Sequence, residues 1–102
     1  MHIIVDNLSV KAQAYLSIFI EDKLDQDVLW VVDQELVDCT VGICLGANAL
    51  YKALGLRGIG KHRGWHKKAS MGVTYHPDYA MNNDMVEQFE QDIISFIERI
   101  KA

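Results

Sequence analysis

The chain has 102 residues, half of them apolar, and a net charge of −4 at neutral pH. This length provides material for one compact domain with one core and excludes a second domain. No apolar run reaches the roughly 18 to 20 residues that span a bilayer, and no basic segment followed by an apolar one opens the chain. We therefore expect a cytoplasmic protein without a membrane partner. Two cysteines, Cys39 and Cys44, are too few for a disulfide framework, and we expect neither a bound metal nor another cofactor.

The charge is distributed unevenly along the chain. Residues 1–39 carry a net charge of −6, residues 40–75 carry +6, and residues 76–102 carry −4. The basic side chains concentrate in a segment, residues 57–68, that also contains Trp65. Basic residues interleaved with an aromatic ring are typical of surfaces that bind nucleic acid. A solvated loop that balances an acidic body explains the same pattern equally well.

The first half of the chain predicts strands alternating with one helix. Apolar strands are expected near residues 2–5, 28–33 and 41–45. Ser9 is the expected N-cap of a helix that ends near Lys23 or Leu24, because apolar residues recur after it at helical intervals. These apolar positions are Ala12, Tyr15, Leu16, Phe19 and Ile20.

The second half continues the alternation. A helix is expected over residues 47–54 with Gly55 as its C-terminal stop, and a fourth strand over residues 71–75. Residues 56–68 between them are expected to form a loop or a short extended segment.

The last predicted element is an amphipathic helix, with Asp84 and Glu87 at a capped start. Its apolar stripe consists of Val86, Phe89, Ile93, Phe96, Ile97 and Ile100. Strands that alternate with helices are typical of an α/β fold, here a three-layer α/β/α sandwich in which helices cover both faces of a four-stranded parallel sheet.

The most informative local pattern is the His-Pro segment, residues 74–79, where His76 follows an apolar strand and precedes Pro77. Proline fixes its own φ and biases the preceding residue toward extended geometry, so His76 should lie at the carboxyl end of a strand with its ring held in a defined direction. Open α/β sheets bind ligands at that end. Taken alone, the pattern is also explained by a strand that simply ends there.

Several segments, in their order and spacing, resemble the carboxyl-terminal half of the uracil-DNA glycosylase superfamily, particularly its bacterial and archaeal iron–sulfur branch. The segments that carry this resemblance are residues 41–50, with Leu45-Gly46-Ala47-Asn48-Ala49, then Leu54-Gly55, Lys61-His62-Arg63-Gly64-Trp65, Tyr75-His76-Pro77-Asp78-Tyr79 and the final amphipathic helix. The resemblance covers about residues 41–100. Together with right-handed crossovers it implies the strand order 2-1-3-4, with the loops that follow the four strands converging at a topological switch point.

The resemblance implies roles for residues at this switch point. In the family, a carboxylate or amide after the first strand positions the attacking water, and Asp6 holds that place here. An asparagine after the second strand reads the extruded base, where this chain has Asp33-Gln34. The histidine of the His-Pro segment donates to a uracil oxygen, which points to His76, with Pro77 and Tyr79 matching its neighbours. A fixed donor and an activated water lower the barrier because the departing base gains negative charge.

The chain also departs from the family at important positions. The glycine- and proline-bearing motif after the first strand is missing, and the four thiolates of an iron–sulfur cluster are absent. Asp78 replaces the usual serine and would repel a phosphate, and Ala80 is too small to wedge apart a base stack. These departures predict weak or no catalysis.

We therefore expect a small glycosylase-like protein of DNA metabolism that binds DNA, single-stranded or uracil-containing, or a nucleotide. Besides the His-Pro segment, the residues expected to contact nucleic acid are Lys61, Arg63, Trp65, Lys67 and Lys68. Two alternatives stay open at this point: an active, reduced uracil-DNA glycosylase that uses Asp6 and His76, and a non-enzymatic module that binds a nucleotide or small ligand or forms a homodimer.

Overall fold

The computed structural model describes residues 1–35 and 41–102, whose strands form one five-stranded sheet of order β2-β1-β3-β5-β4. The strands are β1 (His2–Val5), β2 (Leu29–Val32), β3 (Gly42–Leu45), β4 (Gly64–His66) and β5 (Met71–Thr74). β1 pairs in parallel with β2 and β3, and β3 pairs in parallel with β5, whereas β4 runs antiparallel to β5. The chain therefore has an α/β fold with a mixed, mostly parallel sheet.

The four predicted strands and their mutual order are confirmed, but the sheet is not four-stranded and not wholly parallel. Residues 56–68, expected as a loop or short extended segment, contain the short helix α3 (Ile59–His62) and the edge strand β4. β4 has only three residues, of which one is glycine, so it is too short to show the period-two pattern of a strand. Its pairing depends instead on the turn that leads into β5.

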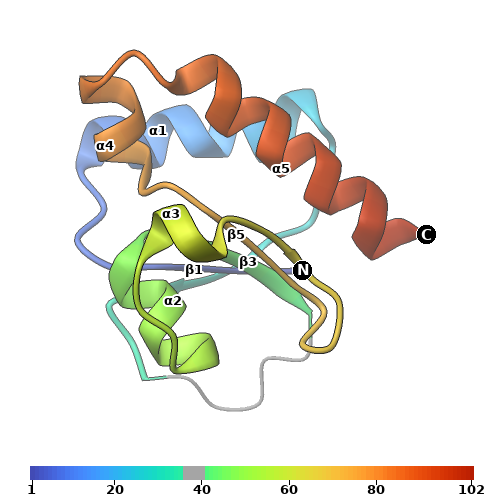
Figure 1. The fold of residues 1–102 in the computed structure, drawn as a ribbon. Coiled ribbons are helices and arrows are strands. Elements are labelled where there is room, and N and C mark those ends of the chain that lie inside the picture. Colours follow the sequence, from blue (N-terminus) through green and yellow to red (C-terminus); the bar gives the residue numbers. More distant parts are fainter. Residues whose placement is uncertain (36–40) are drawn as a thin grey trace.

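Helices cover both faces of the sheet, as Figure 1 shows. On one side lie α1 (Val10–Leu16), α4 (Pro77–Asn82) and α5 (Val86–Lys101), and on the other lie α2 (Ala47–Leu54) and α3. α1 continues into η1 (Ser17–Lys23), a π-helical segment that ends where the sequence pattern predicts. None of the helices in the described residues combines the length and apolarity that a membrane crossing requires.

Local capping explains where several helices begin and end. The Ser9 hydroxyl accepts a hydrogen bond from the Ala12 N–H at 3.1 Å, which confirms Ser9 as the N-cap of α1. Gly55 has a left-handed φ of 68° and ends α2 as predicted. The predicted cap of the last helix by Asp84 is wrong, because Met85 occupies the N-cap position and Asp84 itself adopts a φ of 55°.

Alternate residues of the central strands face opposite layers of the core. Ile3 and Val5 are buried beneath α1 and α5, whereas Ile4 packs toward α2. Burial on both faces explains why these strands have continuous rather than alternating apolar sequences. Cys44 is buried on β3, and Cys39 lies outside the described residues.

A glycine allows α5 to lie close to the sheet. A Cβ atom at Gly72 of β5 would lie 2.3 Å from Cγ of Phe96, which α5 contributes to the core. Because such an approach is impossible for a side chain, only glycine fits beneath this ring. The close contact fixes α5 over β5, next to the edge of the sheet where His76 lies.

Candidate functional site

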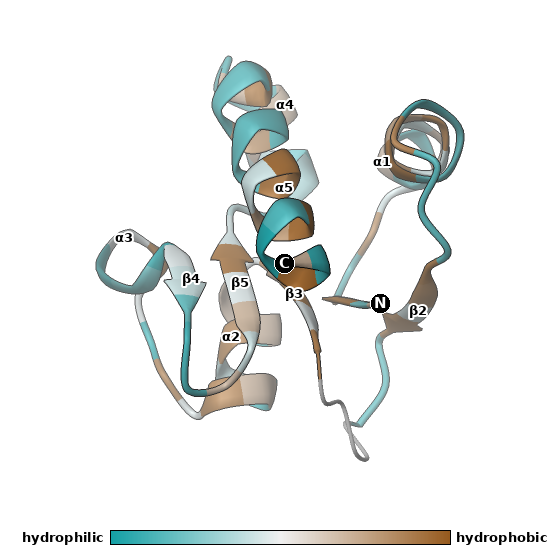
Figure 2. Ribbon diagram, turned by 90° about the vertical axis from the view of Figure 1, so that its right-hand side faces the viewer, coloured by the Kyte–Doolittle hydropathy of each residue, from teal (hydrophilic) through white to brown (hydrophobic). Residues whose placement is uncertain are grey.

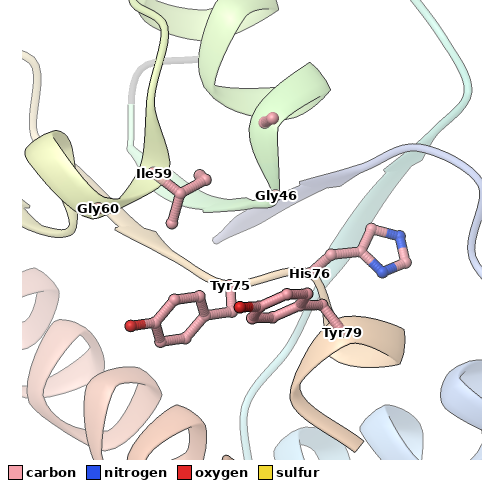
Figure 3. A pocket seen from close by; sticks show the side chains of 7 residues that line it. Gly46, Ile59, Gly60, Tyr75, His76 and Tyr79 are labelled. Atoms are coloured by element: carbon pink, nitrogen blue, oxygen red, sulfur yellow. The ribbon is translucent and has the colours of Figure 1, made fainter. Parts of the chain in front are cut away.

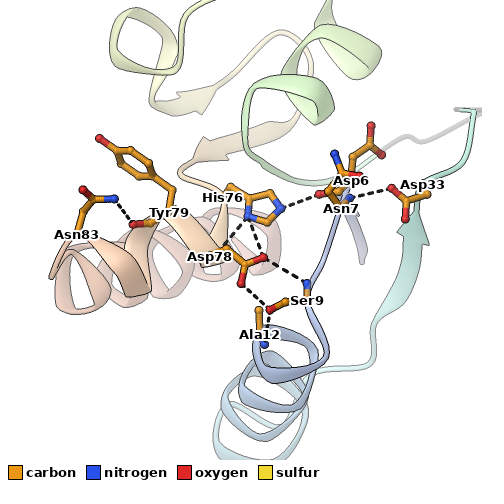
Figure 4. Close-up of polar contacts among 9 residues, drawn as sticks. All are labelled: Asp6, Asn7, Ser9, Ala12, Asp33, His76, Asp78, Tyr79 and Asn83. Atoms are coloured by element: carbon orange, nitrogen blue, oxygen red, sulfur yellow. Dashed lines mark hydrogen bonds and ion pairs between the residues drawn. The ribbon is translucent and has the colours of Figure 1, made fainter.

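The carboxyl ends of the four parallel strands meet at one edge of the sheet. Asp6 follows β1, Asp33 follows β2, Gly46 follows β3, and His76 lies two residues beyond β5. Figure 4 shows Asp6, Asp33 and His76 gathered at this edge, together with Asn7, Ser9 and Asp78. The structure thus brings together three of the side chains that the sequence placed at the switch point.

The imidazole of His76 has a partner within the chain at each ring nitrogen. Nδ1 accepts a hydrogen bond from the Asp78 backbone N–H at 3.1 Å, which makes His76 the N-cap of α4 with Pro77 as the first helical residue. Since Nδ1 accepts, the proton lies on Nε2, which donates to the Asp6 backbone carbonyl at 2.6 Å. His76 therefore joins the end of β5 to the end of β1.

The carboxylate of Asp6 does not face the imidazole. It forms an ion pair with Lys52 of α2 at 2.8 Å, and only 12% of its side chain is exposed. The Lys52 ammonium also donates to the Gln34 backbone carbonyl at 3.2 Å. In Figure 4 the Asp6 carboxylate lies on the side away from His76, so the two candidate catalytic groups do not converge on a common point.

Asp33 and Gln34 also take part in contacts between loops. The Asp33 carboxylate accepts a hydrogen bond from the Asn7 backbone N–H at 2.8 Å, and both residues adopt left-handed φ values, 53° and 55°. Asparagine and aspartate tolerate this conformation better than most residues do. Gln34 contributes its carbonyl to Lys52, as described above, so the loop after β2 is connected to the loop after β1 and to α2.

The aspartate at position 78 has a clear structural partner. Its carboxylate accepts hydrogen bonds from the Ser9 hydroxyl at 2.5 Å and from the Ser9 backbone N–H at 3.2 Å. Ser9 in turn caps α1, so Asp78 ties the start of α1 to the first turn of α4. This contact joins residues 69 positions apart, and the sequence alone showed only an acidic replacement for serine.

A pocket of about 480 Å³ lies beside this polar network. It is lined by Gly46, Ala47, Ile59, Gly60, Tyr75, His76 and Tyr79. The rings of Tyr75 and Tyr79 stack with their centroids 5.6 Å apart, and Figure 3 shows both hydroxyls pointing one way while the His76 ring points the other way. The volume and the largely apolar lining are typical of pockets that hold small molecules.

The pocket joins two segments that the sequence analysis had considered separately. Tyr75, His76 and Tyr79 come from the His-Pro segment, while Ile59 and Gly60 come from the basic segment. Sequence reasoning identified His76 and Tyr79 but missed Tyr75 and the part played by α3. No local signal marks α3 as a pocket wall, because its position depends on the antiparallel pairing of β4.

The basic segment is divided between two ends of the sheet. Lys61 lies on α3, next to the pocket-lining Gly60, and its side chain is exposed. Lys67 and Lys68 lie in the exposed turn that precedes β5, at the opposite end of β5 from the pocket. The structure therefore places Lys61 next to a pocket-lining residue, and Lys67 and Lys68 away from the pocket.

Arg63 and Trp65 attach the β4 region to α5. Nε of Arg63 lies 2.7 Å from one carboxylate oxygen of Asp92, and Nη2 lies 3.0 Å from the other. This hydrogen bonding raises the pKa of the Arg63 guanidinium. The Trp65 ring is partly buried and lies 6.3 Å from the Phe96 ring, so packing on the sheet is the arrangement seen for this tryptophan.

No family model, curated protein or solved structure matches this chain. The resemblance to uracil-DNA glycosylases therefore stays a prediction from the sequence. Among residues 1–35 and 41–102, no group of three or more histidine, cysteine, aspartate or glutamate side chains is arranged to hold a metal ion. Function is inferred below from the pocket and the polar network beside it.

Proposed function

We propose that this protein binds a nucleobase, in single-stranded DNA or in a nucleotide, in the pocket between the His-Pro segment and α3. In this proposal it is a small uracil-DNA-glycosylase-like protein of DNA metabolism that does not hydrolyse the glycosidic bond efficiently. The proposal depends on one observation: two stacked tyrosines form a wall of the pocket at which the two segments expected to contact nucleic acid meet.

The chemistry of the pocket suits a planar, uncharged ring. Tyr79 is 51% exposed, so its ring is available to a ligand without unfolding any element. Stacking a base on an aromatic side chain contributes about 1 to 3 kcal/mol and tolerates any base. Lys61 on α3 adds a positive charge near the pocket, which favours a ligand that carries phosphate.

The polar network argues against efficient catalysis. To donate to a uracil oxygen, His76 Nε2 would first lose its hydrogen bond to the Asp6 carbonyl. To activate a water, the Asp6 carboxylate would first separate from Lys52. Catalytic donors stabilise a transition state most when they are already oriented toward the reacting atoms, and neither group is so oriented here.

Binding of a labelled single-stranded oligonucleotide, followed by fluorescence anisotropy at low salt, tests the proposal. Replacement of Tyr79 by alanine should weaken binding by about 1 to 3 kcal/mol, because the stacking surface is lost. Tyr51→Ala is the matched control, since Tyr51 is 50% exposed on α2 and does not line this pocket. Tyr51→Ala should bind as the parent does.

Three results would contradict the proposal. If Tyr79→Ala and Tyr51→Ala lose the same affinity, or if the parent does not bind at low salt, the pocket does not bind a base. Either result would favour the alternative of a non-enzymatic interaction module. Release of uracil from single-stranded DNA that is abolished by Asp6→Asn or by His76→Ala would show instead that the protein is an active uracil-DNA glycosylase of reduced size.

A further inference from the structure

The edge strand β2 presents an apolar sequence on the outside of the sheet. It reads Leu29-Trp30-Val31-Val32, and Leu29 is 60% exposed, whereas every residue of β3 and β5 is buried. Figure 2 shows β2 at the outer limit of the sheet, with no helix or strand of the described residues beyond it. The opposite edge strand, β4, is shorter and includes a glycine.

The backbone of β2 has hydrogen-bonding groups that point away from the sheet. The Leu29 N–H donates to the Met1 carbonyl at 2.8 Å, and the Asp33 N–H donates to the Val5 carbonyl at 3.1 Å. Because peptide groups alternate in direction along a strand, those of Trp30 and Val32 point to the open side. Such a row of outward N–H and C=O groups is a template on which another strand can pair.

Carboxylates flank this template at both ends. Asp25 and Asp27 precede β2, Asp33 and Glu35 follow it, and all four residues are exposed, although the Asp33 carboxylate also accepts from the Asn7 N–H. An incoming strand therefore meets an apolar centre between two negatively charged ends. Opposite charges on facing strands stabilise pairing, whereas like charges directly opposite each other destabilise it.

A second copy of this chain is a poor occupant of the edge. Antiparallel pairing of two copies with Trp30 opposite Trp30 would place Asp27 of each copy opposite Asp33 of the other. The neighbouring register, with Trp30 opposite Val32, would place Asp27 opposite Glu35. Both registers set carboxylate against carboxylate, which disfavours these two ways of pairing the edge with itself.

We propose that the β2 edge binds an extended segment of a partner protein that has an apolar centre and lysine or arginine at both ends. The segment would add a strand to the sheet through the peptide groups of Trp30 and Val32, and its basic ends would face the flanking carboxylates. This interaction lies on the far edge from α3 and is independent of the proposed base pocket.

The probe for this proposal is a short fluorescent peptide of alternating valine and threonine with two lysines at each end. The control peptide has glutamates in place of the lysines. Fluorescence anisotropy with the parent protein at low salt should show binding of the lysine peptide, and binding of the glutamate peptide should be weaker on the order of tenfold.

Three protein variants test whether the peptide binds at the β2 edge. Val32→Pro removes an outward N–H that β1 does not use, and it should abolish binding of the lysine peptide. Val32→Thr has a similar shape and keeps the N–H, so it should bind as the parent does. Asp27→Lys combined with Glu35→Lys leaves one aspartate and one lysine at each end of β2, so it should abolish the preference for the lysine peptide.

Circular dichroism establishes whether Val32→Pro is folded, and if it is not, the charge-reversed variant decides. The proposal is overturned if Val32→Pro binds as Val32→Thr does, if charge reversal leaves the preference unchanged, or if neither peptide binds the parent. It is also overturned if sedimentation shows a parent dimer that Val32→Pro converts to monomers, because the edge would then be occupied by a second copy.

Discussion

At the scale of single residues, the polar side chains at the carboxyl edge of the sheet mainly connect its loops. His76 links the end of β5 to the end of β1, Asp33 links the loops after β1 and β2, and Lys52 links α2 to both loops. Each of these bonds joins residues distant in sequence. Because these bonds hold the loops in place, the pocket beside them has a defined shape before any ligand binds.

The structural role of His76 predicts a stability effect. His76→Ala removes the donor to the Asp6 carbonyl and the acceptor for the Asp78 N–H, and it should lower the free energy of unfolding by about 1 to 3 kcal/mol. Urea denaturation of the parent and the variant measures this change. Lys67→Ala is the control, and its effect should stay within about 0.5 kcal/mol because this side chain is exposed in the turn before β5. An unchanged stability in His76→Ala would mean that the imidazole does not hold the two loops together.

Tyr15 predicts a loss of stability at alkaline pH. Its hydroxyl donates to the Glu90 carboxylate, and burial followed by this hydrogen bond raises the pKa of Tyr15 above its ordinary value of 10.0. Above about pH 10 the unfolded chain therefore loses a proton that the folded chain retains, so stability should fall as the pH rises and be unaffected by this group at lower pH. Denaturation at a series of alkaline pH values should show a smaller decline in Tyr15→Phe. The same decline in both proteins would contradict the assignment.

At the scale of elements, α5 is held to the sheet by its buried apolar stripe, which includes one close contact, and by one shared carboxylate. Phe96 lies over Gly72 of β5, and Asp92 accepts hydrogen bonds from the Thr74 hydroxyl and from Arg63. Thr74 is fully buried, so its hydroxyl requires this partner. One helix therefore secures both β5 and the segment that enters β4.

The contact beneath Phe96 predicts that β5 does not tolerate a side chain at position 72. Gly72→Ala should lower the free energy of unfolding by about 1 to 3 kcal/mol, because the Phe96 ring must move to admit the methyl group. Gly60→Ala is the matched control, since a Cβ atom there meets nothing within 4 Å. Combining Gly72→Ala with Phe96→Leu should cost less than the sum of the two single changes, which a double-mutant cycle of urea denaturation would measure.

At the scale of the whole molecule, the sequence predicted the parallel part of the sheet because continuous apolar strands and amphipathic helices have distinct periods. It did not predict β4, whose three residues show no period, or α4, whose first residue is the proline that suggested only a strand end. The position of His76 was predicted, but its partners were not. The partner of His76 Nε2 is a backbone carbonyl 70 residues away, and no sequence pattern indicates such a contact.

The division of the basic segment predicts a shallow salt dependence for DNA binding. Within the basic segment, Lys61 follows the pocket-lining Gly60, whereas Arg57 stacks on Tyr51 at 4.2 Å and Arg63, which lies over the Tyr75 ring, is already paired with Asp92. Each phosphate neutralised on a single strand adds about 0.7 to the slope of log affinity against log salt, so a slope of about 1 is expected. Lys61→Ala should reduce that slope, and Lys67→Ala combined with Lys68→Ala should leave it unchanged. A slope of about 2 to 4 that the double variant lowers would place the nucleic acid along the whole segment.

The pairing of β1 with strands on both sides also has a consequence for how the chain folds. β1 pairs with β2 and with β3, and β3 pairs with β5, so each parallel contact of the sheet joins segments separated by a long stretch of chain. Only the β4–β5 pair closes a short turn. Closing each long loop costs conformational entropy before the paired strands contribute stabilising contacts. Such topologies therefore fold slowly. Because Phe96 of α5 lies over Gly72 and Asp92 of α5 accepts from Thr74, the core over β5 is complete only when α5 has packed, and we expect this step to come late in folding.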